Sequence, residues 1–200
     1  MRKAAEGCTT TVTAIAGGIG AGKSVVSRVL RVMGYDVYDC DSRAKRLIAE
    51  DAELLDSIRL QVCADAVDAR GCYDRAAVAR VVFADEARLQ ALNSLVHGAV
   101  KADFARWCDA RAGHSRLFVE TAILHSAGMD AVVDDVWVVT APDDVRIARV
   151  MARNNITAAQ VQARLDAQKR EEEALAAHEH IIVNDNIHPL LPQILTLLNS

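Results

Sequence analysis

The eight residues 17–24 read GGIGAGKS, and they constrain the fold more than any other part of the chain. They follow an apolar, β-branched stretch at Thr10–Ala16, which predicts a buried strand, and they precede apolar residues at helical spacing over 23–33. Glycines let such a loop turn its amide N–H groups inward, and the N-terminus of the following helix adds partial positive charge. A glycine-rich turn that arose by chance would have no reason to lie between a strand and a helix. The sequence therefore predicts a nucleotide-phosphate site in an α/β sheet.

The motif also assigns roles to its last two residues. We expect Lys23 to reach the β- and γ-phosphates of ATP, and the Ser24 hydroxyl to ligate Mg²⁺. The loop residues expected to hold the phosphates are Gly18, Gly20, Ala21, Gly22, Lys23 and Ser24. The motif alone leaves open which molecule receives the phosphoryl group.

The remaining periodicity predicts one three-layer α/β domain with a central parallel sheet. Strand patterns are found at 35–40, 116–120, 132–140 and 181–183, and a helix closes the chain after Pro189. Residues 42–113 are mainly helical and too long for one crossover, so we expect them to form an inserted lobe. A charged helical tract at 143–177 is expected to form a lid. The core would then comprise residues of about 8–41, 114–142 and 178–200.

Composition argues against several classes of partner. Aromatic residues make up 4% of the chain and the net charge is −4, so we expect no nucleic-acid partner. No apolar run approaches the length of a membrane span. The five cysteines form no CxxC pair, which favours free thiols in the cytoplasm. We expect a cytoplasmic monomer or weak homo-oligomer that acts on a small molecule.

An acidic pair, Asp39 and Asp41, ends the second predicted strand, at the sheet edge where ligands gather. In extended chain both side chains would point the same way. One carboxylate could accept the proton of an acceptor hydroxyl while the other ordered Mg²⁺ through water. Alternatively, Asp41 caps the helix predicted over 43–49.

Basic residues concentrate in the 143–177 tract, at Arg146, Arg149, Arg153, Arg164, Lys169 and Arg170. The first three follow i, i+3, i+7 spacing and so share one helical face. Arginines on a lid can offset phosphate charge while the lid excludes water. The alternative is a solvated helix whose arginines pair with Asp143, Asp144 and Glu171–Glu173.

Taken in order, several blocks resemble the dephospho-coenzyme A kinase family over nearly the whole chain. They are AGGIGAGKS, YDVYDCDSRAK, LNSLVHGAV, VETAILHSAG, VVTAPDDVRIARVMARNN, VQARLDAQ and IIVNDN. The resemblance implies MgATP-dependent phosphorylation of the ribose 3′-hydroxyl of dephospho-coenzyme A. It also implies a P-loop nucleotide-kinase core, a helical acceptor-binding lobe and an arginine-bearing lid.

The resemblance also implies roles for single residues. Asp41 matches the proposed base beside the acceptor hydroxyl, and Asp39, which precedes it in the Asp-x-Asp block, is also expected to bind the acceptor. By the same matching, Lys45 and His97 contact the acceptor, although a lone histidine such as His97 is more often structural. The catalytic set is completed by Lys23, Arg149 and Arg153, and the ATP set by Val25 and Asn184. Glu120 is either a residue behind the Mg²⁺ site or a polar strand end.

The chain departs from the family pattern at five positions. Lys45 replaces an arginine, which loses bidentate geometry. Val25, Gly98, Ala122 and Ser126 replace threonine, proline, proline and glutamate, respectively. Because Lys23, Ser24 and Asp41 remain, we expect an active enzyme.

The sequence leaves two other functions open. Another small-molecule kinase, of the nucleoside monophosphate or shikimate type, would share the core and differ in the inserted lobe. A nucleotide-dependent regulatory module would not need Asp41, and the chain has no NKxD motif of a GTPase switch.

Overall fold

The computed structural model describes residues 10–200, so the predicted start of the core near residue 8 lies outside the described part. The chain divides into two compact units. One consists of the residues up to Tyr38 together with Ala112–Ser200, and the other is Asp39–Arg111. No helix within residues 10–200 is both long and apolar enough to cross a bilayer.

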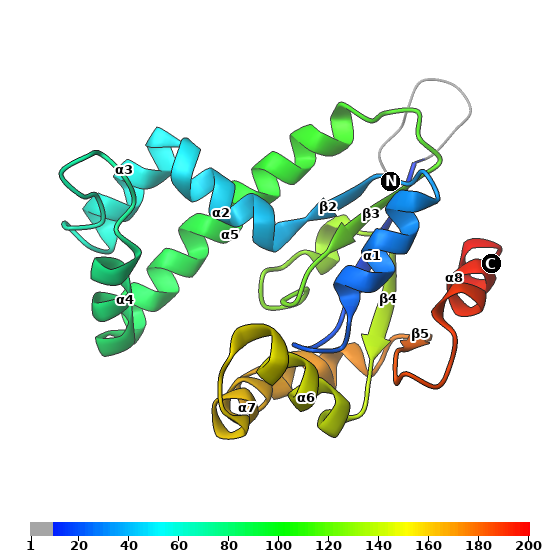
Figure 1. Cartoon of the computed structure of the whole chain (residues 1–200). Helices are drawn as coiled ribbons and strands as arrows, with labels where there is room; N and C mark the ends of the chain where they lie inside the picture. Colours follow the sequence, from blue (N-terminus) through cyan, green and yellow to red (C-terminus); the bar gives the residue numbers. More distant parts are fainter. Residues whose placement is uncertain (1–9) are drawn as a thin grey trace. The chain divides into compact units, whose positions relative to one another are not determined.

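A five-stranded sheet forms the centre of the first unit, in the order β2-β3-β1-β4-β5 (Figure 1). The strands are β1 (Thr11–Ala16), β2 (Val37–Asp39), β3 (Arg116–Glu120), β4 (Asp135–Thr140) and β5 (His180–Val183). β1 pairs in parallel with β3 and β4, and β4 pairs in parallel with β5. Successive residues of β1 are buried, as expected for a sheet covered on both faces. The predicted parallel α/β fold is therefore confirmed.

Two strands are shorter than the sequence pattern predicts. β2 ends at Asp39 because Cys40 already begins a helix. β4 begins only at Asp135, because residues Asp130–Val132 form a short 3-10 helix, η1. A helix thus ends β2 early, and a short 3-10 helix delays the start of β4.

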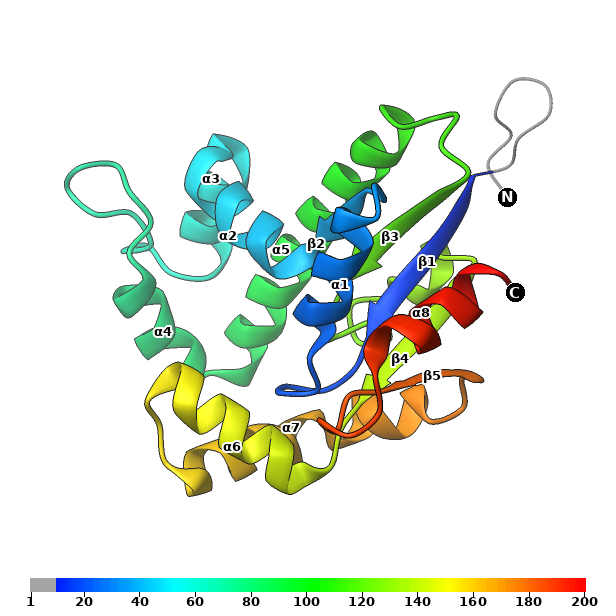
Figure 2. The same cartoon turned by 45° about the vertical axis from the view of Figure 1, so that its right-hand side comes forward.

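Helices α1 (Lys23–Val32) and α8 (Leu190–Leu198) lie on one face of the sheet (Figure 2). Side chains at alternate strand positions meet them there, because successive residues of a strand point to opposite faces. The resulting core includes Ile15, Phe118, Trp137, Ile182, Val26, Leu30 and Ile194. It contains two of the chain's few large aromatic residues.

The charged tract predicted as one lid forms two helices, α6 (Asp143–Asn154) and α7 (Ala158–Leu175). Asn155 ends α6 in the left-handed conformation, with φ of 52°. Thr157 and Gln160 then start α7 with a capping box. These local signals turn the tract into a helical hairpin.

The second unit consists of α2 (Cys40–Glu50), α3 (Ala52–Gln61), α4 (Arg75–Ala84) and α5 (Glu86–Asp109). All four are N-capped by aspartate side chains, from Asp39, Asp51, Asp74 and Asp85. Their apolar faces enclose a core around Leu54, Ile58, Val62, Val78 and Val82. Residues 40–111, all of them described, hold no strand beyond the single bridge Val67–Tyr73.

Candidate active site

The glycine loop leaves the carboxyl end of the central strand β1 and runs into the N-terminus of α1. Gly17, Gly20 and Gly22 have φ of 142°, 79° and 103°, which L side chains rarely adopt. A Cβ atom at Gly17 would lie 2.2 Å from the Val139 carbonyl oxygen, and one at Gly22 would lie 1.9 Å from Asn184 Nδ2. The loop therefore has the conformation that a phosphate-binding cup requires.

Lys23 begins α1 and turns its side chain back toward the loop. Its Nζ atom donates to the carbonyl oxygens of Gly17 and Gly18, at 2.7 and 3.2 Å. No acidic residue lies in the first turn of α1, so the partial positive charge of this helix end is not offset locally. Ser24 and Val25 follow in the same turn and are exposed. This end of the sheet is thus electropositive where an anion would bind.

Arg146 occupies a buried place beside this loop, at 6% exposure. Its guanidinium donates to the Ile19 carbonyl oxygen at 3.0 Å, to Asp143 at 3.0 Å, and to both carboxylate oxygens of Glu172. A Cβ atom on Gly18 would lie 1.9 Å from Glu172 Oε1. Arg146 is therefore held in an ion-pair network, and the alternative of acidic partners for the basic tract holds at this residue.

Arg149 and Asn184 come together against the loop. Asn184 is buried and donates from Nδ2 to the Ala21 carbonyl oxygen at 2.8 Å. Arg149 reaches Asn186 Oδ1 at 2.6 Å, and Asn184 Oδ1 and the Gly20 carbonyl oxygen at 3.4 Å each. The structure thus places Arg149 at the loop, where a guanidinium could contact phosphate oxygens.

The other basic residues of the tract are more exposed. Arg153 lies one turn further along α6, and its Nε donates to Asn154 Oδ1 at 3.0 Å. Arg164, Lys169 and Arg170 are exposed at three positions around α7. On this face of α6, exposure therefore increases from Arg146, which is buried, through Arg149 to Arg153, which is exposed.

The Asp39–Asp41 pair differs from its expected geometry. Asp39 accepts from the Ser42 backbone N–H at 3.0 Å and from the Ser42 hydroxyl at 2.7 Å, so Asp39 is the N-cap of α2. Asp41 lies in the first turn of that helix and is exposed. The expectation of two carboxylates aligned on extended chain is wrong, because the helix starts one residue before Asp41. The proposed cap at Asp41 is wrong for the same reason.

Lys45 and His97 also belong to the helical unit. Lys45 is exposed on α2, one turn after Asp41, and His97 is half-buried within α5. Burial, and then the nearby Lys101 charge, lower the pKa of His97 below its ordinary value of 6.5. His97 is therefore neutral at physiological pH and can both donate and accept a hydrogen bond.

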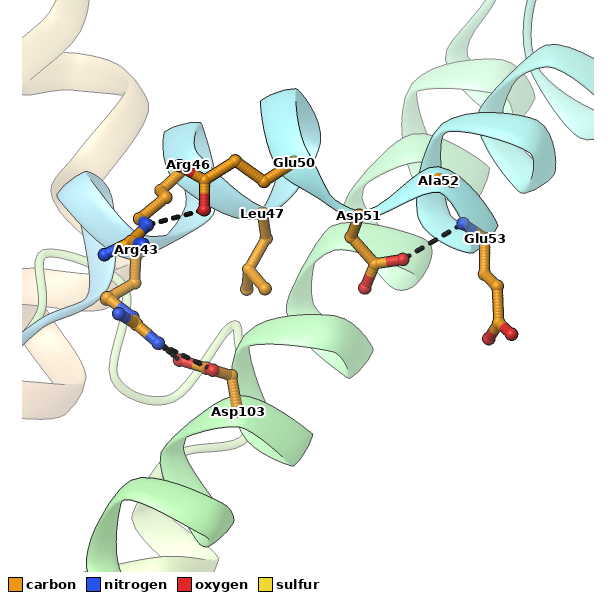
Figure 3. Close-up of a pocket in the computed structure, with 8 residues that line it drawn as sticks. All are labelled: Arg43, Arg46, Leu47, Glu50, Asp51, Ala52, Glu53 and Asp103. Atoms are coloured by element: carbon orange, nitrogen blue, oxygen red, sulfur yellow. Dashed lines mark hydrogen bonds and ion pairs between the residues drawn. The ribbon is translucent and has the colours of Figure 1, made fainter.

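A cavity of about 500 Å³ opens among α2, α3 and α5 in the same unit (Figure 3). Its lining is Arg43, Arg46, Leu47, Glu50, Asp51, Ala52, Glu53 and Asp103. Arg43 pairs with Asp103 through two bonds of 2.8 and 2.7 Å, and Arg46 pairs with Glu50 at 2.7 Å. The predicted acceptor residues Asp41, Lys45 and His97 do not line it.

Among the residues of α7 that support the site, the sequence patterns missed Gln168, and they named Glu171 and Glu172 only as possible partners of the arginines. Gln168 accepts from the Ile19 backbone N–H at 2.8 Å. Glu171 accepts from the backbone N–H groups of His125 and Ser126, at 2.7 and 3.0 Å, and Glu172 holds Arg146. One signal was available, since these polar residues share a helical face with the apolar Leu165 and Leu175.

The polar groups around the glycine loop fit a nucleoside triphosphate with Mg²⁺. The glycine cup, the Lys23 ammonium and Arg149 supply hydrogen-bond donors and positive charge, and the Ser24 hydroxyl can ligate a cation. Among residues 10–200, no group of three or more His, Cys, Asp or Glu side chains could hold a metal ion. A hydroxyl with substrate phosphates and water is the usual Mg²⁺ arrangement in such sites.

Comparison with known proteins gives a consistent result. The family model described as Dephospho-CoA kinase matches residues 11–189. A dephospho-CoA kinase of Bacteroides fragilis is 34% identical over 187 residues, covering 92% of this chain and 89% of its own. That of Porphyromonas gingivalis is 35% identical, covering 93% and 92%.

Solved structures agree in fold. The crystal structure of TT1252 from Thermus thermophilus aligns with a TM-score of 0.77 and 32% identity, covering 95% of both chains. A dephospho-CoA kinase from Campylobacter jejuni aligns with a TM-score of 0.69 over 96% of both chains, at 20% identity. With a P-loop at the centre of a parallel sheet and these matches along most of its length, the chain belongs to the dephospho-CoA kinase family.

Proposed function

We propose that this chain phosphorylates the ribose 3′-hydroxyl of dephospho-CoA with ATP, giving CoA and ADP. The observation that carries the proposal is the three-glycine cup at the N-terminus of α1, in a chain that belongs to this kinase family. In the transfer, a bond forms between the 3′-oxygen and the γ-phosphorus of ATP. The bond from that phosphorus to the β-γ bridging oxygen breaks, and ADP leaves.

On the donor side, the loop amides of Gly18 and Gly20–Ser24 bind and orient the phosphates, and Lys23 and Arg149 offset their charge. Arg153, at the more exposed end of α6, adds positive charge to the same set. Mg²⁺, when bound, neutralises charge on the β- and γ-phosphate oxygens, and Ser24 would be its protein ligand. Val25 lines the same turn, and Asn184, which braces Ala21, forms part of the nucleotide site.

On the acceptor side, Asp41 accepts the proton of the 3′-hydroxyl as the new bond forms. Its exposed place in the first turn of α2 leaves the carboxylate accessible to a sugar hydroxyl. Lys45 lies one turn further along the same helix and contributes positive charge for the acceptor's phosphates. His97 contributes a neutral imidazole, which can donate or accept a hydrogen bond with the acceptor. Asp39 supports Asp41 indirectly, because it fixes the start of α2.

The proposal includes the division of labour along the chain. Residues 42–113 form the acceptor lobe, and 143–177 form the lid over the nucleotide. We also propose a cytoplasmic location without membrane partners and without a nucleic-acid partner, and the net charge of −4 supports the last point. We propose a monomer or weak homo-oligomer.

The decisive experiment incubates the purified chain with MgATP and dephospho-CoA and scores CoA by mass spectrometry. Parallel reactions with nucleoside monophosphates and with shikimate test the rival kinases. We expect CoA only in the first reaction, and dephospho-CoA but neither rival acceptor to raise the melting temperature. Product with a rival acceptor and none with dephospho-CoA would refute the proposed acceptor.

A further inference from the structure

One residue of the glycine loop, Ile19, is held by side chains from both helices of the 143–177 tract. Its backbone N–H donates to Gln168 Oε1 of α7 at 2.8 Å. Its carbonyl oxygen accepts from Arg146 Nε of α6 at 3.0 Å. Both backbone polar groups of Ile19 are therefore bound by side chains more than a hundred positions away in sequence.

The Ile19 side chain makes a third connection. It packs against a small apolar cluster between α6 and α7, formed by Val150, Val161 and Leu165. Ile147 and Ile156 pack against the same cluster. The loop thus inserts one apolar side chain between the two helices while its backbone binds both of them.

The Arg146 connection is itself braced. Arg146 is 6% exposed and also pairs with Asp143 and Glu172. Breaking a buried pair of this kind by removing one partner leaves an uncompensated charge, which is strongly unfavourable. Arg146, near the start of α6, therefore holds the Ile19 carbonyl group in place. If the hairpin moves, either the glycine loop moves with it or the movement is confined to the part of the hairpin after Arg146.

We infer that Ile19 couples the phosphate loop to the α6–α7 hairpin, and that Gln168 is a positioning residue which sets nucleotide affinity through the Ile19 amide. Because the Ile19 N–H group donates to Gln168, this amide is not a donor to the phosphates. The inference rests on the nucleotide site of the proposed function but not on the identity of the acceptor.

The test replaces Gln168 with methionine, which keeps the length and helix propensity of the side chain and removes the acceptor oxygen. The matched control is Gln162→Met, since Gln162 is exposed on the same helix and bonds within it, to Asp166 at 3.0 Å. For Gln168→Met we expect the Kd of MgADP, measured by calorimetry, to rise about 3- to 10-fold, the usual worth of one hydrogen bond. The control should stay within the error of the wild type.

Two further readouts separate positioning from general destabilisation. In Gln168→Met, KM for ATP should rise with the Kd while KM for dephospho-CoA stays unchanged. Amide hydrogen exchange should accelerate at Ile19 but not in the β4 or β5 strands.

An unchanged Kd for MgADP together with unchanged exchange at Ile19 would overturn the inference. Equal acceleration of exchange throughout the sheet would overturn it as well, because the effect would then be global. A wild-type chain that binds MgADP but makes no CoA would refute the proposed acceptor and leave the coupling through Ile19 intact.

Discussion

The two units of the molecule use their polar side chains in different ways. In the sheet-bearing unit, Gln168, Arg146 and Asn184 reach loop atoms 127 to 163 positions away in sequence. In the helical unit, the aspartates at 39, 51, 74 and 85 bond the start of the helix that follows them. The phosphate loop is thus held by long-range contacts, whereas the starts of the lobe's helices are fixed by local caps, and Arg43–Asp103 adds a long-range pair between α2 and α5.

This difference has a functional consequence. A loop held from several sides is preorganised, and preorganised donors bind developing charge without the cost of reorienting during the reaction. Residues of the helical unit such as Asp41 and Lys45 project instead from the exposed face of a helix. Substitutions in the loop should therefore alter both its structure and its chemistry, whereas substitutions at exposed positions on α2 should alter mainly chemistry.

The largest expected effect is that of Lys23→Ala. Removing a positioned charge at the transferring group should lower kcat by roughly 10³-fold. Because Nζ also bonds the Gly17 and Gly18 carbonyl oxygens, the free energy of unfolding should fall by about 1 kcal/mol. Single-turnover kinetics and urea titrations measure the two effects. A variant with wild-type turnover would show that this loop does not bind the transferred phosphoryl group.

Asp41→Asn should lower kcat by about 10²-fold or more, the usual contribution of a positioned general base. Its free energy of unfolding should fall only slightly, by about 0.5 kcal/mol, because Asp41 is exposed and loses only its interaction with the N-terminus of α2. The matched control is Asp56→Asn, another exposed helical aspartate, which pairs with Arg59. Equal turnover in both variants would remove Asp41 from the mechanism.

Asp39 tests whether a carboxylate of the Asp-x-Asp block acts only through local structure. Asp39→Ala should reduce the free energy of unfolding by about 1 kcal/mol, the typical worth of a helix N-cap. Asp39→Ser keeps a capping oxygen and should restore that stability, as measured by urea denaturation. If the serine variant is stable yet loses turnover, the Asp39 carboxylate has a direct role with the acceptor.

The smallest expected effect is a pH dependence at His97. Since its folded-state pKa is lowered below 6.5, the unfolded chain binds more protons in the window just under that pH. Stability should therefore decrease as the pH falls through about 6.5 toward the folded pKa. His97→Gln should remove this part of the pH dependence, measured as the urea midpoint at several pH values.

A control for His97 comes from the second cause of the shift. Lys101→Met should raise the His97 pKa toward its ordinary value, which an NMR titration can follow. A pKa that stays the same in this variant would attribute the shift to burial alone.

Local sequence signals predicted most of the fold. The glycine motif, the alternating strand patterns and the proline before α8 each depend on neighbours in the chain, and the corresponding elements were found. The exceptions were also local: an early helix start at Cys40 shortened β2, and Asn155 divided the lid tract. Such boundaries depend on one or two residues, which a periodic pattern does not resolve.

The sequence by itself determined the phosphate loop, because strand, glycines, lysine and helix are consecutive and their geometry is set by backbone preferences. Only the tertiary structure decided which polar residues brace that loop. Arg146 and Arg149 lie one turn apart on α6 and have identical side chains. Arg146 is buried in ion pairs, whereas Arg149 reaches Asn186 and the loop. Their difference depends on what packs against each position of α6, since burial and partner choice come from segments far apart in the chain.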